Sequence, residues 1–137
     1  MKTTISIIDD NASLLATLSI SLRLYGYRII IFSDPEKALR HHSTKPADFY
    51  IIDMGLPKMN GIEFYSSLCK EFNVESVPAL FLTAIDHYEA QCLKKTSIGD
   101  YITKPFNTEG LVARIERILR KKPNNFKNSV LQLGNLQ

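Results

Sequence analysis

Cysteine is scarce in this sequence of 137 residues, and long apolar runs are missing from it. The two cysteines, Cys69 and Cys92, share no short spacing, which favours reduced thiols in a cytoplasmic protein over a disulfide or a metal pair. No apolar stretch reaches the length of a membrane span. Residues 1–20 also lack the layout of a secretory signal, because Asp9 and Asp10 interrupt the apolar run. We therefore expect a cytoplasmic protein without a membrane partner.

Acidic residues are missing from the C-terminal end of the chain. The whole sequence has 17 basic and 14 acidic residues, and four of the basic ones lie in this end: Arg120, Lys121, Lys122 and Lys127. The preceding part therefore carries a slight excess of acidic residues, 14 against 13 basic. This balance argues against a nucleic-acid surface on the body of the protein.

The length is enough for one domain with a hydrophobic core. Short apolar segments predict strands at residues 4–8, 27–32, 48–53, 77–83 and 100–103. The amphipathic segments between and after them predict helices at residues 11–25, 33–42, 61–72, 85–96 and 107–122. This alternation predicts an α/β fold, a doubly wound parallel sheet of five strands with helices on both faces.

Turn and capping residues mark several of the predicted helix ends. Gly26 is the expected stop of the first helix. Ser33 and Glu36, on either side of Pro35, form a capping pattern for the second helix. Asn60 is the expected cap of the third. These signals place loops between the predicted elements.

Polar side chains with reactive chemistry follow four of the predicted strands. Asp9 and Asp10 follow the first strand, and Asp53 ends the third. Thr83 ends the fourth strand, and Lys104 follows the fifth. Taken singly, these residues have ordinary explanations, such as a helix N-cap for Asp10 or a solvated surface position for Lys104. The carboxyl ends of parallel strands meet at one edge of a sheet, however, so their joint placement predicts one site.

Three carboxylates at one edge would repel one another unless a cation neutralises them. Mg²⁺ is usually held by one or two carboxylates with phosphate oxygens and water, so Asp9 and Asp10 are candidate ligands. Asp53 can then act as a nucleophile toward phosphorus and form an acyl phosphate. Lys104 and Thr83 carry the charge and the hydroxyl that would stabilise the transferred group.

Four segments together resemble the receiver domain of two-component response regulators: IIDDN, DFYIIDMGLPKMNG, VPALFLTA and DYITKPF. The likeness runs from residue 1 to about residue 121, and the five signature positions match in order and spacing. It implies a flavodoxin-like receiver fold with strand order 2-1-3-4-5 and five flanking helices. It also implies a signalling protein that catalyses only its own phosphorylation and dephosphorylation.

The resemblance assigns roles to the acidic residues and their neighbour. Asp53 is the implied phosphoacceptor, and a cognate histidine kinase is the implied phosphoryl donor. The residues implied to hold Mg²⁺ are Asp9, Asp10, Asp53 and, through its backbone carbonyl, Gly55.

Further roles follow for residues around the fifth strand. Lys104 is implied to pair with the phosphoryl group, and its peptide bond to Pro105 is cis in the family. Thr83 turns its hydroxyl toward the same group. Tyr101 matches the family's switch aromatic, which swings inward when Thr83 moves.

The stretch from residue 100 to residue 122 is similar to winged-helix transcription regulators of the OmpR/PhoB type. In that group, the face of the fourth helix, fifth strand and fifth helix forms a symmetric homodimer on activation. The candidate residues for pairs across such a dimer are Lys94, Lys95, Asp100, Arg114 and Glu116. Gly99 and Gly110 stand where that group usually has acids, which predicts fewer pairs across the dimer.

The chain is predicted to have three parts. Residues 1–122 form the receiver domain, and residues 123–129 form a polar linker. Residues 130–137 resemble the first strand of an effector domain, so we expect the natural chain to continue into a DNA-binding domain. Two alternatives stay open: this end is a frayed extension, or the protein is a stand-alone receiver that binds a target protein without DNA.

Other classes of site fit these residues less well. A phosphatase of the haloacid dehalogenase type needs a second acid two residues after the nucleophile, where this chain has Gly55. A flavodoxin shares the sheet, but Asp9 and Asp10 would repel its phosphate. The three histidines show no ligand spacing, and we expect all of them at the surface: His41, His42 and His87.

Overall fold

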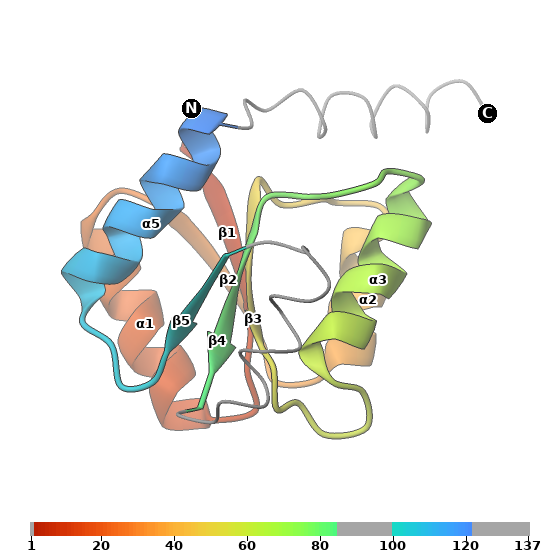
Figure 1. Ribbon diagram of the computed structural model, residues 1–137, viewed down its shortest axis with the longest axis horizontal. Coiled ribbons are helices and arrows are strands. Elements are labelled where there is room, and N and C mark those ends of the chain that lie inside the picture. The colour runs from red at the N-terminus through yellow and green to blue at the C-terminus, as the bar shows by residue number, and fades with distance from the viewer. Residues whose placement is uncertain (1, 85–99, 122–137) are drawn as a thin grey trace.

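The computed structural model describes residues 2–84 and 100–121. Its strands form one parallel sheet in the order β2-β1-β3-β4-β5, which confirms the predicted fold class (Figure 1). The strands are β1 (Thr4–Ile8), β2 (Arg28–Phe32), β3 (Phe49–Asp53), β4 (Ala79–Thr83) and β5 (Asp100–Thr103). The described helices are α1 (Ala12–Leu24), α2 (Pro35–His42), α3 (Gly61–Phe72) and α5 (Thr108–Lys121). The helix predicted at residues 85–96 and everything after residue 121 lie outside the described residues.

Helices cover both faces of the sheet, with α1 and α5 on one side and α2 and α3 on the other (Figure 1). Successive residues of a strand point to opposite faces, so Ile51 and Ile52 of β3 enter different clusters. Ile51 packs with Leu18 of α1 and Ile115 of α5, whereas Ile52 packs with Phe64 of α3. The central strands β3 and β4 are therefore buried on both sides, as is usual in parallel sheets.

The register of the strands aligns their carboxyl ends at one edge. Ile8, the last residue of β1, pairs in register with Phe32 of β2 and Ile52 of β3. Thr83 at the end of β4 pairs with Thr103 at the end of β5. Residues that immediately follow these strands consequently share one edge of the sheet.

Side-chain caps set the helix starts, and the cap of α2 differs from the sequence prediction. The side chain of Asn11 caps α1 by accepting a hydrogen bond from the Leu14 backbone N–H at 3.1 Å, so Asp10 does not have this role. Asp34, not Ser33, caps α2, because Pro35 is the first helical residue and the cap directly precedes it.

The remaining helix ends follow the sequence signals. Asn60 caps α3 as predicted and forms a capping box with Glu63. After α1, Gly26 adopts a φ of +94°, a left-handed conformation that glycine tolerates and that reverses the chain toward β2. The turn residues therefore define where α1 ends and where α3 begins.

His42 is buried, which contradicts the expected surface position. Its Nδ1–H donates to the Lys45 carbonyl at 2.8 Å, and its Nε2 accepts from the Ser6 hydroxyl at 2.7 Å. Burial lowers the pKa of His42 to about 4. The neutral imidazole thus ties the end of α2 to β1, while His41 is partly exposed and His87 lies outside the described residues.

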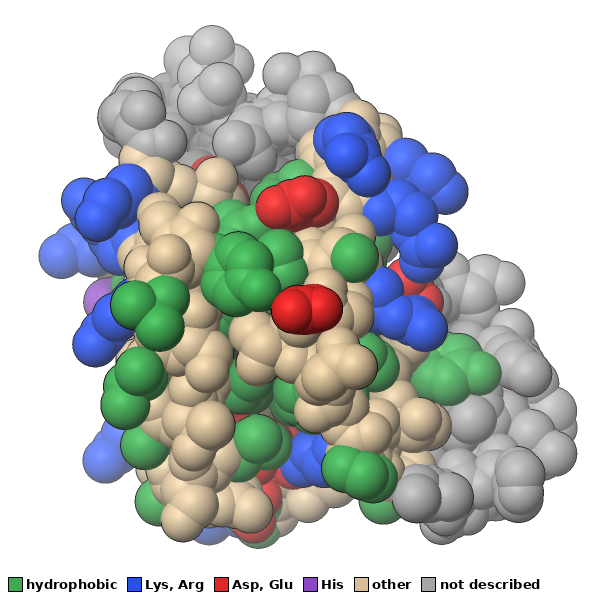
Figure 2. All heavy atoms as spheres, turned by 90° about the vertical axis from the view of Figure 1, so that its left-hand side faces the viewer, with side chains coloured by type: hydrophobic (Ala, Val, Ile, Leu, Met, Phe, Trp, Pro, Cys, Tyr) green, Lys and Arg blue, Asp and Glu red, His purple; other side chains and the backbone are tan. Residues whose placement is uncertain are grey.

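The outer surface contains apolar side chains on α1. Ile20 is 63% exposed and Leu24 is 84% exposed. Viewed from the side of α1 and α5, Lys and Arg side chains flank a central area of apolar and acidic side chains (Figure 2).

Within residues 2–84 and 100–121, no helix is long and apolar enough to cross a membrane. Cys69 is buried on α3, and Cys92 lies outside the described residues.

Candidate functional site

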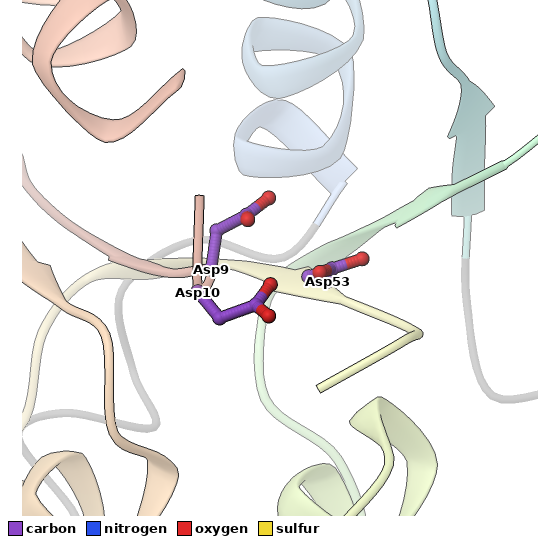
Figure 3. A group of neighbouring side chains, drawn as sticks. All are labelled: Asp9, Asp10 and Asp53. Carbon is purple, nitrogen blue, oxygen red and sulfur yellow. The ribbon is translucent and has the colours of Figure 1, made fainter. Parts of the chain in front are cut away.

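Three carboxylates converge at the carboxyl edge of the sheet, as the sequence predicted. Asp9 and Asp10 follow β1, and Asp53 is the last residue of β3 (Figure 3). One carboxylate oxygen from each lies within 4.8 Å of the others. Asp9 is fully buried, Asp53 is 7% exposed, and Asp10 faces solvent. These oxygen donors match what a hard divalent cation such as Mg²⁺ prefers.

One ammonium group lies among the carboxylates. Nζ of Lys104 is 3.1 Å from Asp9 Oδ2 and 3.6 Å from Asp53 Oδ1. Burial raises the pKa of Asp53, and the neighbouring charge of Asp9 raises it further. A hydrogen bond from the Gly55 backbone N–H and the charge of Lys104 oppose this rise. Three carboxylates against one ammonium leave an excess of negative charge that a divalent cation would offset.

Backbone groups hold the two buried carboxylates in place. The Gly55 N–H donates to Asp53 Oδ1 at 3.1 Å, and the Asn11 N–H donates to Asp9 Oδ1 at 2.9 Å. These bonds orient the side chains and leave each Oδ2 available for other partners, which for Asp9 is Lys104.

Gly61 supports the site, although the sequence reasoning did not single it out. A Cβ at this position would lie 2.6 Å from the Asp53 carbonyl oxygen and 3.0 Å from the Met54 Cα. The Gly61 N–H donates to the Met54 carbonyl at 3.1 Å. Only glycine allows α3 to begin this close to the end of β3. The Asn-Gly pair at the start of α3 was the available signal, but the contact it makes is not visible in the sequence.

The other signature residues surround the acidic cluster. Thr83 is fully buried at the end of β4, and its hydroxyl donates to the Ala84 carbonyl at 3.0 Å. The Lys104 N–H donates to the Thr83 carbonyl at 2.8 Å, which fixes the start of the loop after β5. The peptide bond between Lys104 and Pro105 is cis, as the resemblance implied. Tyr101, half-buried on β5, packs against the core cluster that contains Phe81.

The family model for the response regulator receiver domain matches residues 5–116. This chain is a member of the response regulator receiver family. The match covers most of the chain and includes each of the residues placed at the acidic edge. Residues 5–116 therefore form a response regulator receiver domain, which belongs to a family of signalling phosphoacceptors.

Curated relatives of this receiver are larger proteins. The alkaline phosphatase synthesis transcriptional regulatory protein PhoP of Bacillus subtilis is 36% identical over 124 residues, which are 88% of this chain and 50% of that protein. The heme response regulator HssR of Staphylococcus saprophyticus is 33% identical over 135 residues, which are 98% of this chain and 58% of that protein. The chain thus spans between half and about three fifths of the length of these two relatives.

Solved receiver structures share the fold. The chemotaxis protein CheY4 of Vibrio cholerae superposes with a TM-score of 0.77 at 26% identity, covering 87% of this chain and 100% of that one. A CheY-like receiver domain protein of Methanospirillum hungatei gives a TM-score of 0.78, covering 88% of this chain and 96% of that one. At 22% identity, the second likeness concerns the fold alone.

The residues predicted for a dimer face are partly engaged within this receiver. Asp100 accepts hydrogen bonds from Arg114 at 3.0 Å and from Arg117 at 2.7 Å. Arg114 also donates to the Tyr101 carbonyl at 2.8 Å. Sequence reasoning missed Arg117, which lies one turn of α5 after Arg114. Glu116 is exposed, and Lys94 and Lys95 lie outside the described residues.

Proposed function

We propose that Asp53 accepts a phosphoryl group from a histidine kinase. The observation that carries this proposal is a nearly buried carboxylate at the sheet edge with an ammonium 3.6 Å away and two further carboxylates beside it. One Asp53 oxygen attacks phosphorus, and the bond between phosphorus and the donor nitrogen breaks with its electron pair remaining on the donor. The product is an acyl phosphate on Asp53.

The side chains around Asp53 are suited to stabilise that transfer. Mg²⁺, held by Asp9, Asp10, Asp53 and the Gly55 carbonyl, would supply positive charge next to the transferred group. Lys104 can pair with a phosphoryl oxygen while it remains near Asp53. The raised pKa of Asp53 means that lowering the pH removes the nucleophile earlier than for an ordinary carboxyl.

The test of this proposal is phosphorylation by a small donor. Incubation with acetyl phosphate and Mg²⁺ should add one phosphoryl group to the wild-type chain, seen by intact-protein mass spectrometry, and Asp53→Asn should abolish the gain. Asp34→Asn is the matched control, because it makes the same substitution at the cap of α2, away from the site, and asparagine also caps helices. Wild-type yield from the Asp53→Asn variant would contradict the assignment.

We further propose that phosphorylation changes the face built from the predicted fourth helix, β5 and α5. Thr83 would move toward the phosphoryl group and Tyr101 inward, shifting the balance between two conformations. In a longer natural chain this would control homodimerisation and transcription through a separate DNA-binding domain. The support comes from relatives such as PhoP of Bacillus subtilis, whose name describes a transcriptional regulatory protein.

A second candidate is a stand-alone receiver that binds a target protein. This candidate is favoured because the chain covers 100% of the chemotaxis protein CheY4. It is also favoured because Asp100 forms ion pairs with Arg114 and Arg117 of its own chain, which leaves it less able to pair with a partner subunit. The coding sequence beyond residue 137 separates the two: a stop codon would favour the stand-alone receiver, and a winged-helix domain would favour the transcription regulator.

A further inference from the structure

A basic hollow opens at the amino edge of the sheet, away from the acidic site. Its volume is about 340 Å³, and its lining residues are Lys2, Arg23, Tyr27, Arg28 and Ile29. The proposed phosphorylation chemistry uses none of them. Three of the five are cations, and the lining includes no acidic residue.

The fold brings these residues together from three segments. The Arg28 N–H donates to the Thr3 carbonyl at 2.9 Å, so Lys2 lies next to the start of β2. The turn after α1 closes with a hydrogen bond of 2.9 Å from the Gly26 N–H to the Arg23 carbonyl. This turn connects the end of α1 to the start of β2. Arg23, near the end of α1, therefore lies beside Lys2 and Arg28.

Carboxylates do not neutralise the three cations in the part of the chain that the structure describes. The ion pairs found there have Lys104, Arg114 or Arg117 as their cation. Arg23 donates one N–H to the Ile29 carbonyl at a long 3.4 Å, which uses one of the five donors of its guanidinium. The cations of the hollow therefore retain donors for another partner.

Tyr27 lines the same hollow. Burial raises the pKa of Tyr27, and the carboxylate of Glu116 raises it further. A tyrosine hydroxyl is protonated at neutral pH in any case, and this shift only strengthens that state. The charge of Glu116 acts on Tyr27, but Glu116 does not line the hollow.

We propose that this hollow binds a small anion that carries a diphosphate group. Three like charges around one space repel each other, and a ligand with several negative charges would offset them together. Guanidinium groups match phosphate oxygens with paired hydrogen bonds, whereas a single carboxylate would engage fewer of the donors. The volume falls within the range of small-ligand sites. The diphosphate could be free or part of a nucleotide, and both share this chemistry.

Titration of the 137-residue chain by two-dimensional ¹H–¹⁵N NMR tests the proposal. The buffer is free of magnesium and low in salt, and the probes are pyrophosphate, adenosine diphosphate, inorganic phosphate and citrate. Pyrophosphate should shift the amides of Arg23, Tyr27 and Arg28, and added salt should weaken binding. Tighter binding of adenosine diphosphate than of pyrophosphate would identify a nucleotide as the source, and equal binding would identify the diphosphate alone.

Paired variants separate specific binding from general charge. Arg23→Gln combined with Arg28→Gln should raise the Kd for pyrophosphate about tenfold or more. The control combines Lys37→Gln with Arg40→Gln, which removes the same charge from exposed positions of α2 and should change the Kd by less than about twofold.

Three outcomes would overturn the proposal. They are equal loss of affinity in both paired variants, citrate binding as tightly as pyrophosphate, or amide shifts confined to the acidic edge. Asp53→Asn should bind pyrophosphate like the wild type, so failure of the phosphoacceptor assignment and failure of this site are distinguishable. Backbone spectra of each variant establish that it is folded.

Discussion

The ammonium of Lys104 lies closer to Asp9 than to Asp53, at 3.1 Å against 3.6 Å. Asp9 is fully buried, so without Lys104 its charge would have no cationic partner among the described residues. Lys104 thus has a structural task, neutralising Asp9, in addition to its proposed contact with the phosphoryl group.

Lys104→Met should therefore lower the free energy of unfolding in metal-free buffer. We expect a loss of about 1–3 kcal/mol, below that of a fully buried pair because the Lys104 side chain is 30% exposed. Lys104 and Mg²⁺ would compete to neutralise Asp9, so Mg²⁺ should stabilise the variant more than the wild type and recover part of this loss. Binding at about 100 times its Kd adds about 2.7 kcal/mol. Urea denaturation with and without Mg²⁺ measures both effects, and Lys70→Met on the surface of α3 is the control. Equal Mg²⁺ stabilisation of variant and wild type would contradict competition between Lys104 and the metal.

Gly61→Ala should disturb the end of β3. Because the new Cβ would lie 2.6 Å from the Asp53 carbonyl oxygen, α3 must move away, and we expect a loss of about 1–3 kcal/mol. Phosphorylation by acetyl phosphate should also slow. Gly55→Ala is the matched control, since its Cβ would be 3.9 Å from Asp53 Oδ1 and stability should change by less than about 0.5 kcal/mol. Similar unfolding midpoints for both variants would show that the close approach is not required.

His42 should make stability depend on pH in the mildly acidic range. Burial lowers its pKa to about 4, and an unfolded histidine titrates near pH 6.5. As the pH falls, the unfolded state takes up the proton first, so this contribution is complete above about pH 6.5 and is lost by about pH 4. The two pKa values correspond to a loss on the order of 3 kcal/mol.

Chemical denaturation from pH 7.5 to pH 4 would measure this contribution. The stability difference between wild type and His42→Gln should shrink as the pH falls, because only the wild type loses the histidine contribution. His41→Gln, at a partly exposed neighbouring position, should follow the wild-type curve. A constant difference between wild type and His42→Gln would contradict the assignment.

Self-association on activation should depend on Arg114. Sedimentation velocity with beryllofluoride, a mimic of the phosphoryl group, should reveal a dimer that Arg114→Glu prevents. Each exposed ion pair contributes only about 0.2–1 kcal/mol, and Asp100 already has two partners in its own chain, so we expect a weak dimer. Arg40→Glu on α2 is the control for charge reversal. A monomer in both states would favour the stand-alone receiver.

The amino-acid sequence by itself determined the fold class, the order of the elements and the position of the acidic edge. The strands at Thr4–Ile8 and Asp100–Thr103 lie where the sequence predicts them. In the central strands β3 and β4, burial on both faces selects apolar residues locally. Asp9, Asp53 and Thr83 could be assigned to one edge because parallel strands align their carboxyl ends.

Tertiary structure decided which side chains meet, because those contacts join distant segments. His42 looked like a surface residue at the end of a short helix, yet it bonds to Ser6, which is 36 positions earlier in the chain. The sequence suggested that Asp100 pairs with a partner subunit, but in the structure Arg114 and Arg117 of α5 form ion pairs with it. Local periodicity indicates which face of an element is apolar, whereas the burial of a polar residue such as His42 and the identity of its neighbour depend on how the chain crosses over the sheet. The basic hollow at the amino edge follows the same rule, since its cations come from segments that only the folded chain brings together.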